Sequence, residues 1–175
     1  RANMGSILDF MGSDHRACDE LFAAAEDAVA KSDWDRARDL FARFHAATLH
    51  HLAMEEEVLF PAFEARTGMR MGPTEVMRGE HVQMRDLMQE MASAVAAGNQ
   101  GSFLGLSETL NMLMQQHNLK EENMLYPMAD RVLGDERWPD AIRSQVATGE
   151  LGGFFARAAE LLGAVTDKRF ARYAK

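Results

Sequence analysis

One pattern of eleven residues occurs twice in the sequence, and this repetition constrains the fold more than any other feature. The first copy, H-L-A-M-E-E-E-V-L-F-P, spans residues 51–61, and the second, H-N-L-K-E-E-N-M-L-Y-P, spans residues 117–127. In an α-helix, residues four apart lie one above the other on the same face. Each copy therefore presents an imidazole and a carboxylate on one side of a helix.

The repetition extends upstream to a second pair of histidines. His15 follows Asp14 and His81 follows Glu80, and these two pairs have the same separation along the chain as the two copies of the pattern. The distance from each upstream histidine to the histidine of its own copy is also the same in both halves. The chain thus carries a duplicated H…H-x-x-x-E unit. The residues of this duplicated unit are His15, His51, Glu55, His81, His117 and Glu121.

Apolar residues recur at intervals of three and four along four long stretches, which is the period of an α-helix. We expect helices at about 7–30, 34–66, 74–97 and 102–132, with the two copies of the motif in the second and fourth. Pro61 is expected to kink the second helix or to end it early. One or two further amphipathic helices are expected within residues 140–175.

The positions of the turns predict that the four helices meet at one level. Antiparallel neighbours bring two residues level only if the turn between them lies near their midpoint. That midpoint is residue 33 for the two histidines of the first unit and residue 99 for those of the second, and both fall in expected turns. At a rise of about 1.5 Å per residue, the shared level lies roughly 25 Å from these turns, deep inside a bundle.

Short loops between four helices favour an up-down-up-down topology. We therefore predict an all-α fold in which residues 1–135 form a four-helix bundle and residues 136–175 form a short C-terminal helical extension packed on it. The extension is also a candidate interface, and the oligomeric state is left open.

The composition argues against several other classes of protein. The chain has 175 residues, of which 47% are hydrophobic, so it can bury one substantial core. The chain has a net charge of −8. Proteins that bind nucleic acid or anionic membranes do so through clusters of Lys and Arg, so this charge argues against both kinds of partner. A single cysteine, Cys18, and the absence of a signal-peptide pattern or of an apolar run of membrane-spanning length predict a cytoplasmic protein.

Four imidazoles and two carboxylates that converge inside a bundle would be costly to bury without partners. A bound metal removes that cost. Six protein ligands are too many for one tetrahedral zinc but suit two adjacent first-row ions, with iron favoured, the histidines as terminal ligands, and Glu55 and Glu121 as bridges. The alternative is a set of ordinary surface residues on charged helices, against which the duplicated spacing argues.

Several neighbouring polar residues have other predicted roles. Glu56 and Glu122 lie about 100° around the helix from the predicted bridges, so we interpret them as hydrogen-bonding partners or solvated side chains. Asp14 and Glu80 are candidates to orient an imidazole on a neighbouring helix. Tyr126, four residues after Glu122, is expected to pack in the core with its hydroxyl at the edge and not to act as a redox ligand. Core packing around the ligands is expected of five methionines: Met11, Met77, Met84, Met88 and Met124.

The order of these residues, the L-F-P and L-Y-P endings and the helix spacing resemble the haemerythrin-like HHE cation-binding family over residues 7–132. This resemblance implies a non-haem di-iron centre, often oxo- or hydroxo-bridged, in a left-handed bundle. It also implies terminal ligation by His15, His51, His81 and His117, and bridging by Glu55 and Glu121.

The sequence departs from the oxygen-carrying haemerythrins at two positions. Arg85 stands four residues after His81, where those carriers have a further histidine, and Glu121 stands four after His117, where they have an aspartate five residues after. With only four histidines, both irons would keep an open or water-filled position. We therefore expect a di-iron protein that binds or senses oxygen, peroxide or nitric oxide, or that stores iron.

Two other functions are compatible with the sequence. One is a di-iron oxidoreductase of the catalase, peroxidase or nitric-oxide-reducing kind, although no separate nucleophile, general base or organic-cofactor loop stands out. The other is a metal-free helical interaction domain. A ferritin-like carboxylate oxidase is disfavoured, because none of the predicted histidine ligands has a glutamate three residues before it.

Overall fold

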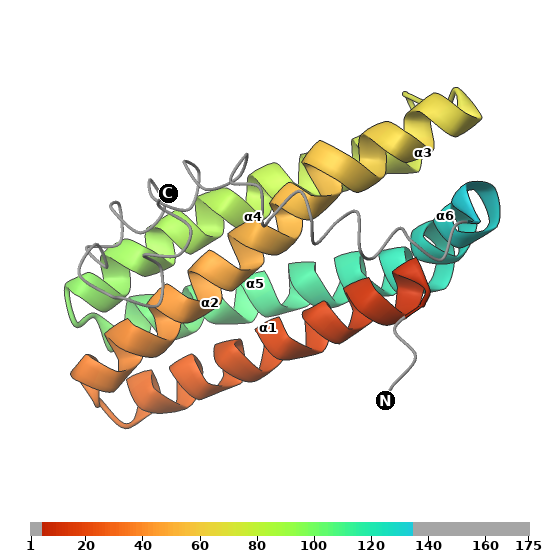
Figure 1. Cartoon of the computed structure of the whole chain (residues 1–175). Coiled ribbons are helices and arrows are strands. Elements are labelled where there is room, and N and C mark those ends of the chain that lie inside the picture. Colours follow the sequence, from red (N-terminus) through yellow and green to blue (C-terminus); the bar gives the residue numbers. More distant parts are fainter. Residues whose placement is uncertain (1–4, 135–175) are drawn as a thin grey trace, which may run out of the picture.

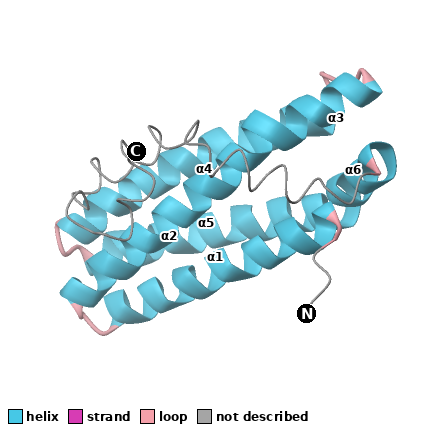
Figure 2. Ribbon diagram, in the orientation of Figure 1, coloured by secondary structure: helices cyan, strands magenta, loops and turns pink. Residues whose placement is uncertain are grey.

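The computed structural model describes residues 5–134, which form a bundle of four long helical segments (Figures 1 and 2). Two five-residue π-helical turns interrupt the second and fourth segments. The elements, in chain order, are α1 (Ile7–Ala30), α2 (Trp34–Met54), the π-turn η1 (Glu55–Leu59), α3 (Phe60–Thr67), α4 (Pro73–Ala96), α5 (Gln100–Lys120), the π-turn η2 (Glu121–Leu125) and α6 (Tyr126–Leu133). Among the described residues there is no β-strand, so the predicted all-α class is confirmed.

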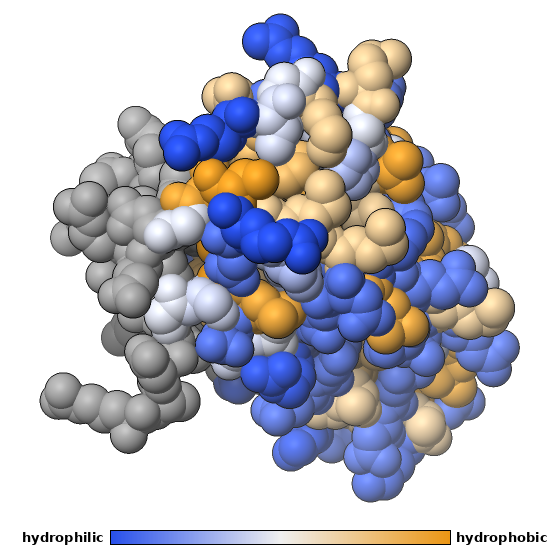
Figure 3. Space-filling view, turned by 90° about the vertical axis from the view of Figure 1, so that its right-hand side faces the viewer, coloured by the Kyte–Doolittle hydropathy of each residue, from blue (hydrophilic) through white to orange (hydrophobic). Residues whose placement is uncertain are grey.

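The four segments close into a ring in the predicted up-down-up-down order. Helix α1 packs on α2, α2 on α4, α4 on α5, and α5 on α1. Helices α3 and α6 pack on each other at the end of the bundle opposite to the α1–α2 and α4–α5 turns (Figure 1). Figure 3 views this end and shows a mainly hydrophilic surface with smaller apolar patches. The described helices include none that is long and apolar enough to cross a membrane.

The duplication seen in the ligand motif extends to every element of the bundle. Each element of the first half has an equivalent of the same length in the second half, at the same separation along the chain as the two copies of the motif. The equivalent pairs are α1 and α4, α2 and α5, η1 and η2, and α3 and α6. The turns follow the same rule. Ser32 and Gly98 both have a positive φ, of 55° and 66°, and Gly68 and Gly134, which end α3 and α6, have φ values of 72° and 53°. The molecule is therefore two similar helical hairpins placed face to face.

Side chains at the helix termini hold the two halves in place. Asp33 and Asn99 cap α2 and α5 at equivalent positions, and each accepts a hydrogen bond from a backbone N–H three residues on. Asp130 of α6 accepts from the first backbone N–H groups of α1, Ile7 at 2.8 Å and Leu8 at 3.1 Å. A carboxylate at the positive end of α1 anchors α6 against the first hairpin.

The second helical segment neither ends nor breaks at Pro61, and it continues to Thr67. Pro61 and its equivalent Pro127 lie in the first turn of α3 and α6, where a missing N–H is tolerated. The irregularity predicted at Pro61 instead lies just before it. In η1 and η2 the backbone bonds join residues five apart, from Phe60 N–H to Glu55 O and from Tyr126 N–H to Glu121 O.

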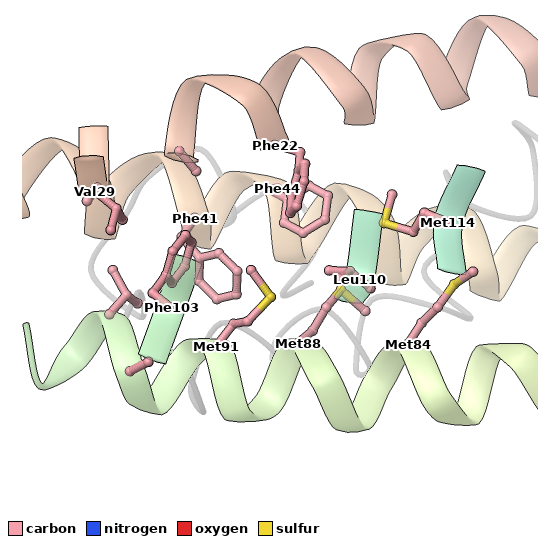
Figure 4. Close-up of a cluster of buried hydrophobic side chains, with 14 of the residues drawn as sticks. Phe22, Val29, Phe41, Phe44, Met84, Met88, Met91, Phe103, Leu110 and Met114 are labelled. Atoms are coloured by element: carbon pink, nitrogen blue, oxygen red, sulfur yellow. The ribbon is translucent and has the colours of Figure 1, made fainter. Parts of the chain in front are cut away.

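Two apolar clusters fill the interior on either side of the ligand level. The larger contains Phe22, Phe41, Phe44, Met84, Met88, Met91, Phe103, Leu110 and Met114, and lies toward the α1–α2 and α4–α5 turns (Figure 4). The smaller contains Ile7, Met11, Met54, Leu59, Phe60, Phe63, Met77, Leu125, Tyr126 and Ala129. Of the five methionines expected in the core, four are buried, but Met124 in η2 is 61% exposed.

The predicted extension over residues 136–175, and with it the boundary at residue 135, falls outside the described residues.

Candidate metal centre

All six residues of the duplicated unit meet between the two apolar clusters, and none is more than 5% exposed. Their donor atoms form two groups, in each of which all atoms lie within 4.8 Å of one another. The two groups, which share one glutamate, are Glu55, His81, His117 and Glu121, and His15, His51 and Glu121. The sequence-predicted site residues are therefore brought together without exception.

Each glutamate of the centre lies between one imidazole of its own half and one of the other half. Glu55 Oε1 lies 3.3 Å from His51 Nε2 and 3.4 Å from His81 Nε2. Glu121 Oε1 lies 3.1 Å from His15 Nε2 and 3.0 Å from His117 Nε2. Each of these carboxylates therefore faces imidazoles of both halves within one buried cluster.

The outer nitrogen of every imidazole is held by a carboxylate from another segment. The Nδ1 contacts are His15 to Glu122 at 2.9 Å, His51 to Asp14 at 2.8 Å, His81 to Glu56 at 2.7 Å and His117 to Glu80 at 2.7 Å. Since the neutral imidazole donates from Nδ1 to the carboxylate, Nε2 is left as an acceptor that faces the centre. The predicted hydrogen-bonding roles of these four acidic residues are thus confirmed.

Several polar atoms at the centre are buried without a hydrogen-bonding partner. They are Glu55 Oε1, His81 Nε2, His117 Nε2 and Glu121 Oε2. Some of them are close to each other, as the 3.4 Å distance between His81 Nε2 and Glu55 Oε1 shows, but without hydrogen-bonding geometry. Buried polar atoms of this kind are costly. Nitrogen and oxygen donors in this number fit first-row metal cations.

Without a bound cation, the charges of the centre depend strongly on one another. Burial disfavours the charged form of His81, but the contact with the negatively charged Glu55 and the hydrogen bond to Glu56 outweigh burial and raise its pKa to about 9. Burial raises the pKa of Glu55, but the positive charge of His51 and the contacts with Glu121 and His81 lower it. The second effect is the larger, so the Glu55 pKa is held well below its usual range. Protons and cations therefore compete for the same atoms.

Tyr126 belongs to the centre, so the prediction that its hydroxyl lies at the edge is wrong. The residue is 0% exposed. Its Oη atom lies 3.2 Å from His15 Nε2, 3.2 Å from His51 Nε2, 2.9 Å from Glu55 Oε2 and 3.1 Å from Glu121 Oε1. The π-turn η2 is the cause, because it places Tyr126 above Glu121 instead of above Glu122. Helical periodicity contains no signal for such a turn.

The two halves differ at this position. Phe60 is the equivalent of Tyr126 and stacks on His81, with ring centroids 5.7 Å apart and an interplanar angle of 22°. Tyr126 packs in the same way against His15, at 5.6 Å and 30°. One half therefore has a hydroxyl where the other has only a ring.

The halves also differ in the cationic side chains that contact the carboxylates bound to the imidazole Nδ1 atoms. Arg85 binds Glu56 through both of its Nη atoms, each at 2.8 Å, and Lys120 pairs with Glu80. Arg85 thus pairs with a carboxylate that itself contacts an imidazole of the centre. The equivalent positions in the first half of the repeat hold Asp19 and Met54, which cannot act in the same way.

A family model described as "Hemerythrin HHE cation binding domain" matches residues 6–129, the segment that contains all the residues of the centre. No curated protein and no solved structure matches the chain significantly.

Proposed function

The chain belongs to the hemerythrin HHE cation-binding domain family, and from this premise we propose that its centre holds two iron ions and binds a small ligand such as oxygen, peroxide or nitric oxide. The proposed terminal ligands are His15 and His51 for one ion and His81 and His117 for the other. Glu55 and Glu121 are the proposed bridges. The observation that carries this proposal is that each glutamate contacts one imidazole from each half.

The surroundings of the centre support a small ligand over an organic substrate. The six residues are at most 5% exposed and lie between two apolar clusters. Six donor residues leave positions open on two six-coordinate ions, and iron with open positions supplies redox and ligand-binding chemistry. The protein's own part is to orient the imidazoles through their Nδ1 atoms and to exclude bulk water.

A di-iron oxidoreductase is the second candidate, and Tyr126 is the observation that favours it. Its Oη atom lies 2.9 Å from Glu55 and 3.1 Å from Glu121, so a phenol side chain, which is capable of acid–base chemistry, lies at the centre. Turnover of peroxide or nitric oxide by the iron-loaded protein, lost in Glu55→Gln, would select this candidate.

Iron analysis and optical spectroscopy test the proposal. The protein is loaded with ferrous iron without oxygen, freed of excess metal, and measured before and after addition of oxygen, peroxide or nitric oxide. We expect two irons per chain and a spectrum that changes with at least one ligand. Glu55→Gln is expected to retain less iron, whereas Glu57→Gln, which changes an exposed residue of the same turn, is the matched control. Wild-type protein that retains no iron would refute the proposal.

A further inference from the structure

Four acceptor atoms surround the hydroxyl of Tyr126. They are the Nε2 atoms of His15 and His51, Glu55 Oε2 and Glu121 Oε1, at distances between 2.9 and 3.2 Å. A phenol has one proton and can donate it to one acceptor at a time. The cluster therefore needs additional positive charge, which comes from protons on the imidazoles in the metal-free protein or from a cation.

The spacing of these atoms matches the donor set of one metal ion. Around a six-coordinate first-row ion with bonds of about 2.1 Å, neighbouring donors are about 3 Å apart. The four distances from Tyr126 Oη fall at this value, and so does the 3.1 Å distance between His15 Nε2 and Glu121 Oε1. Tyr126 Oη thus takes the place of a fifth donor next to two nitrogens and two oxygens.

This inference rests on the proposed iron centre and adds a residue to it: we propose that Tyr126 is a metal ligand, and that its phenolate oxygen binds the ion held by His15 and His51. When the ion binds, the O–H bond of Tyr126 is replaced by an oxygen–metal bond, and the proton leaves to bulk water, as protons generally leave ligands when cations bind. No electron is transferred in this step.

The two metal positions then differ despite the duplication. The position beside His15 and His51 has a phenolate, whereas the position beside His81 and His117 has the ring of Phe60 and no equivalent oxygen. The latter position therefore has one protein donor fewer than the former. The imidazole nitrogens agree with this assignment, because the Nε2 atoms of His81 and His117 are buried without a partner, whereas those of His15 and His51 contact the tyrosine.

Visible absorption of the ferric protein tests the proposal, because a phenolate bound to ferric iron gives an intense charge-transfer band and an imidazole or carboxylate does not. We expect wild-type ferric protein to show this band, together with resonance-enhanced tyrosine ring vibrations. Tyr126→Phe, which makes the position identical to its equivalent Phe60, is expected to lose both. Its iron content, measured independently of any activity, is expected to stay above half of the wild-type value.

Three further measurements complete the test. Tyr173→Phe removes the other tyrosine of the chain and is expected to keep the band. Ring-deuterated tyrosine in the Tyr173→Phe protein, where Tyr126 is the remaining tyrosine of the sequence, is expected to shift the enhanced vibrations, which identifies Tyr126 even if Tyr126→Phe does not fold. The double exchange Tyr126→Phe with Phe60→Tyr is expected to restore a visible band from the other half.

The possible failures are distinguishable. Wild-type protein that retains iron but shows no tyrosine-derived band, or Tyr126→Phe protein that keeps the band, overturns the role of Tyr126 and leaves the iron centre intact. Wild-type protein that retains no iron overturns the proposed function and this inference with it.

Discussion

Individual side chains at the centre are positioned by contacts that cross from one helical segment to another. Glu56 illustrates this, because it accepts from His81 Nδ1 at 2.7 Å and is itself held by the guanidinium of Arg85. These hydrogen bonds lower the pKa of Glu56 to about 2 against the opposing effect of its burial, so the carboxylate stays charged. An imidazole fixed at Nδ1 by a charged acceptor keeps its Nε2 directed toward the centre.

Removal of Glu56 should therefore weaken metal binding without removing a ligand. For Glu56→Ala we expect iron affinity to fall about 10–100-fold, because the His81 ring loses its orienting partner. Competition with a chelator of known affinity measures this change. Glu57→Ala, at an exposed neighbouring position, controls for loss of charge alone. Equal affinities of the two variants would contradict the orienting role.

His45 gives the protein a pH dependence that does not involve the metal centre. The residue is 5% exposed, and burial lowers its pKa to about 4. The unfolded chain has the ordinary value of about 6.5, so it binds a proton that the folded chain excludes. Stability from this group is complete above pH 6.5 and is lost as the pH falls toward 4.

The expected loss from His45 is about 2 kcal/mol at pH 4.5 relative to pH 7. We therefore compare the free energy of unfolding in urea at pH 7 and pH 4.5 for wild-type protein and for His45→Gln, whose side chain at this position cannot titrate. We predict that the decrease is about 2 kcal/mol larger in the wild-type protein. The comparison between the two proteins cancels the contributions of the ligand histidines. Parallel losses would show that His45 titrates normally in the folded state.

At the scale of elements, the π-turns decide which side chains enter the centre. A regular helix would place Tyr126 above Glu122, but the bond from its N–H to Glu121 O places it above Glu121. The same shift exposes Met124 in η2 and aligns Phe60 with Glu55 after η1. The two π-turns thus rotate α3 and α6 as units about their axes.

Deletion of Asn123, an exposed residue of η2, should convert this π-turn to an α-turn. The residues after it keep their helical phase, because Tyr126 becomes the fourth residue after Glu121 in a regular helix, so Tyr126 and Ala129 stay in the smaller apolar cluster. Deletion of Glu20, an exposed residue of the regular helix α1, would instead rotate the residues after it by about 100°. We expect the deletion in α1 to cost about 3 kcal/mol or more, comparable to truncation of a large core side chain, and the deletion of Asn123 to cost much less. Thermal unfolding compares the two variants, and similar melting temperatures for both deletions would contradict the prediction.

The whole described molecule consists of two similar hairpins that enclose a polar layer between two apolar clusters. Neither hairpin contains a complete centre, because each glutamate contacts an imidazole of the opposite half. A cation bound by these residues would therefore link the two halves, and its binding would be coupled to folding of the entire bundle.

Chelation of the metal should lower the melting temperature of the whole bundle. A ligand present at about 1,000 times its dissociation constant stabilises the folded state by about 4 kcal/mol. For a chain of this size, such a loss corresponds to a decrease of about 10 °C. Calorimetry with and without chelator measures it, and His81→Ala with Glu55→Gln should respond much less. An unchanged melting temperature in wild-type protein would favour a metal-free interaction domain.

The sequence by itself determined the four helices, their order and the six residues that meet at the centre. This was possible because the i, i+4 relation between His51 and Glu55 is local, and because the repeat keeps one constant offset and so imposes the same register on both halves. Only the tertiary structure decided the place of Tyr126 and the exposure of Met124. An extra residue per turn shifts the helical phase without a change in composition or apolar period, so it leaves no local trace in the sequence. The ion pairs of Arg85 and Lys120, which make the halves unequal, also depend on packing between helices distant in the chain.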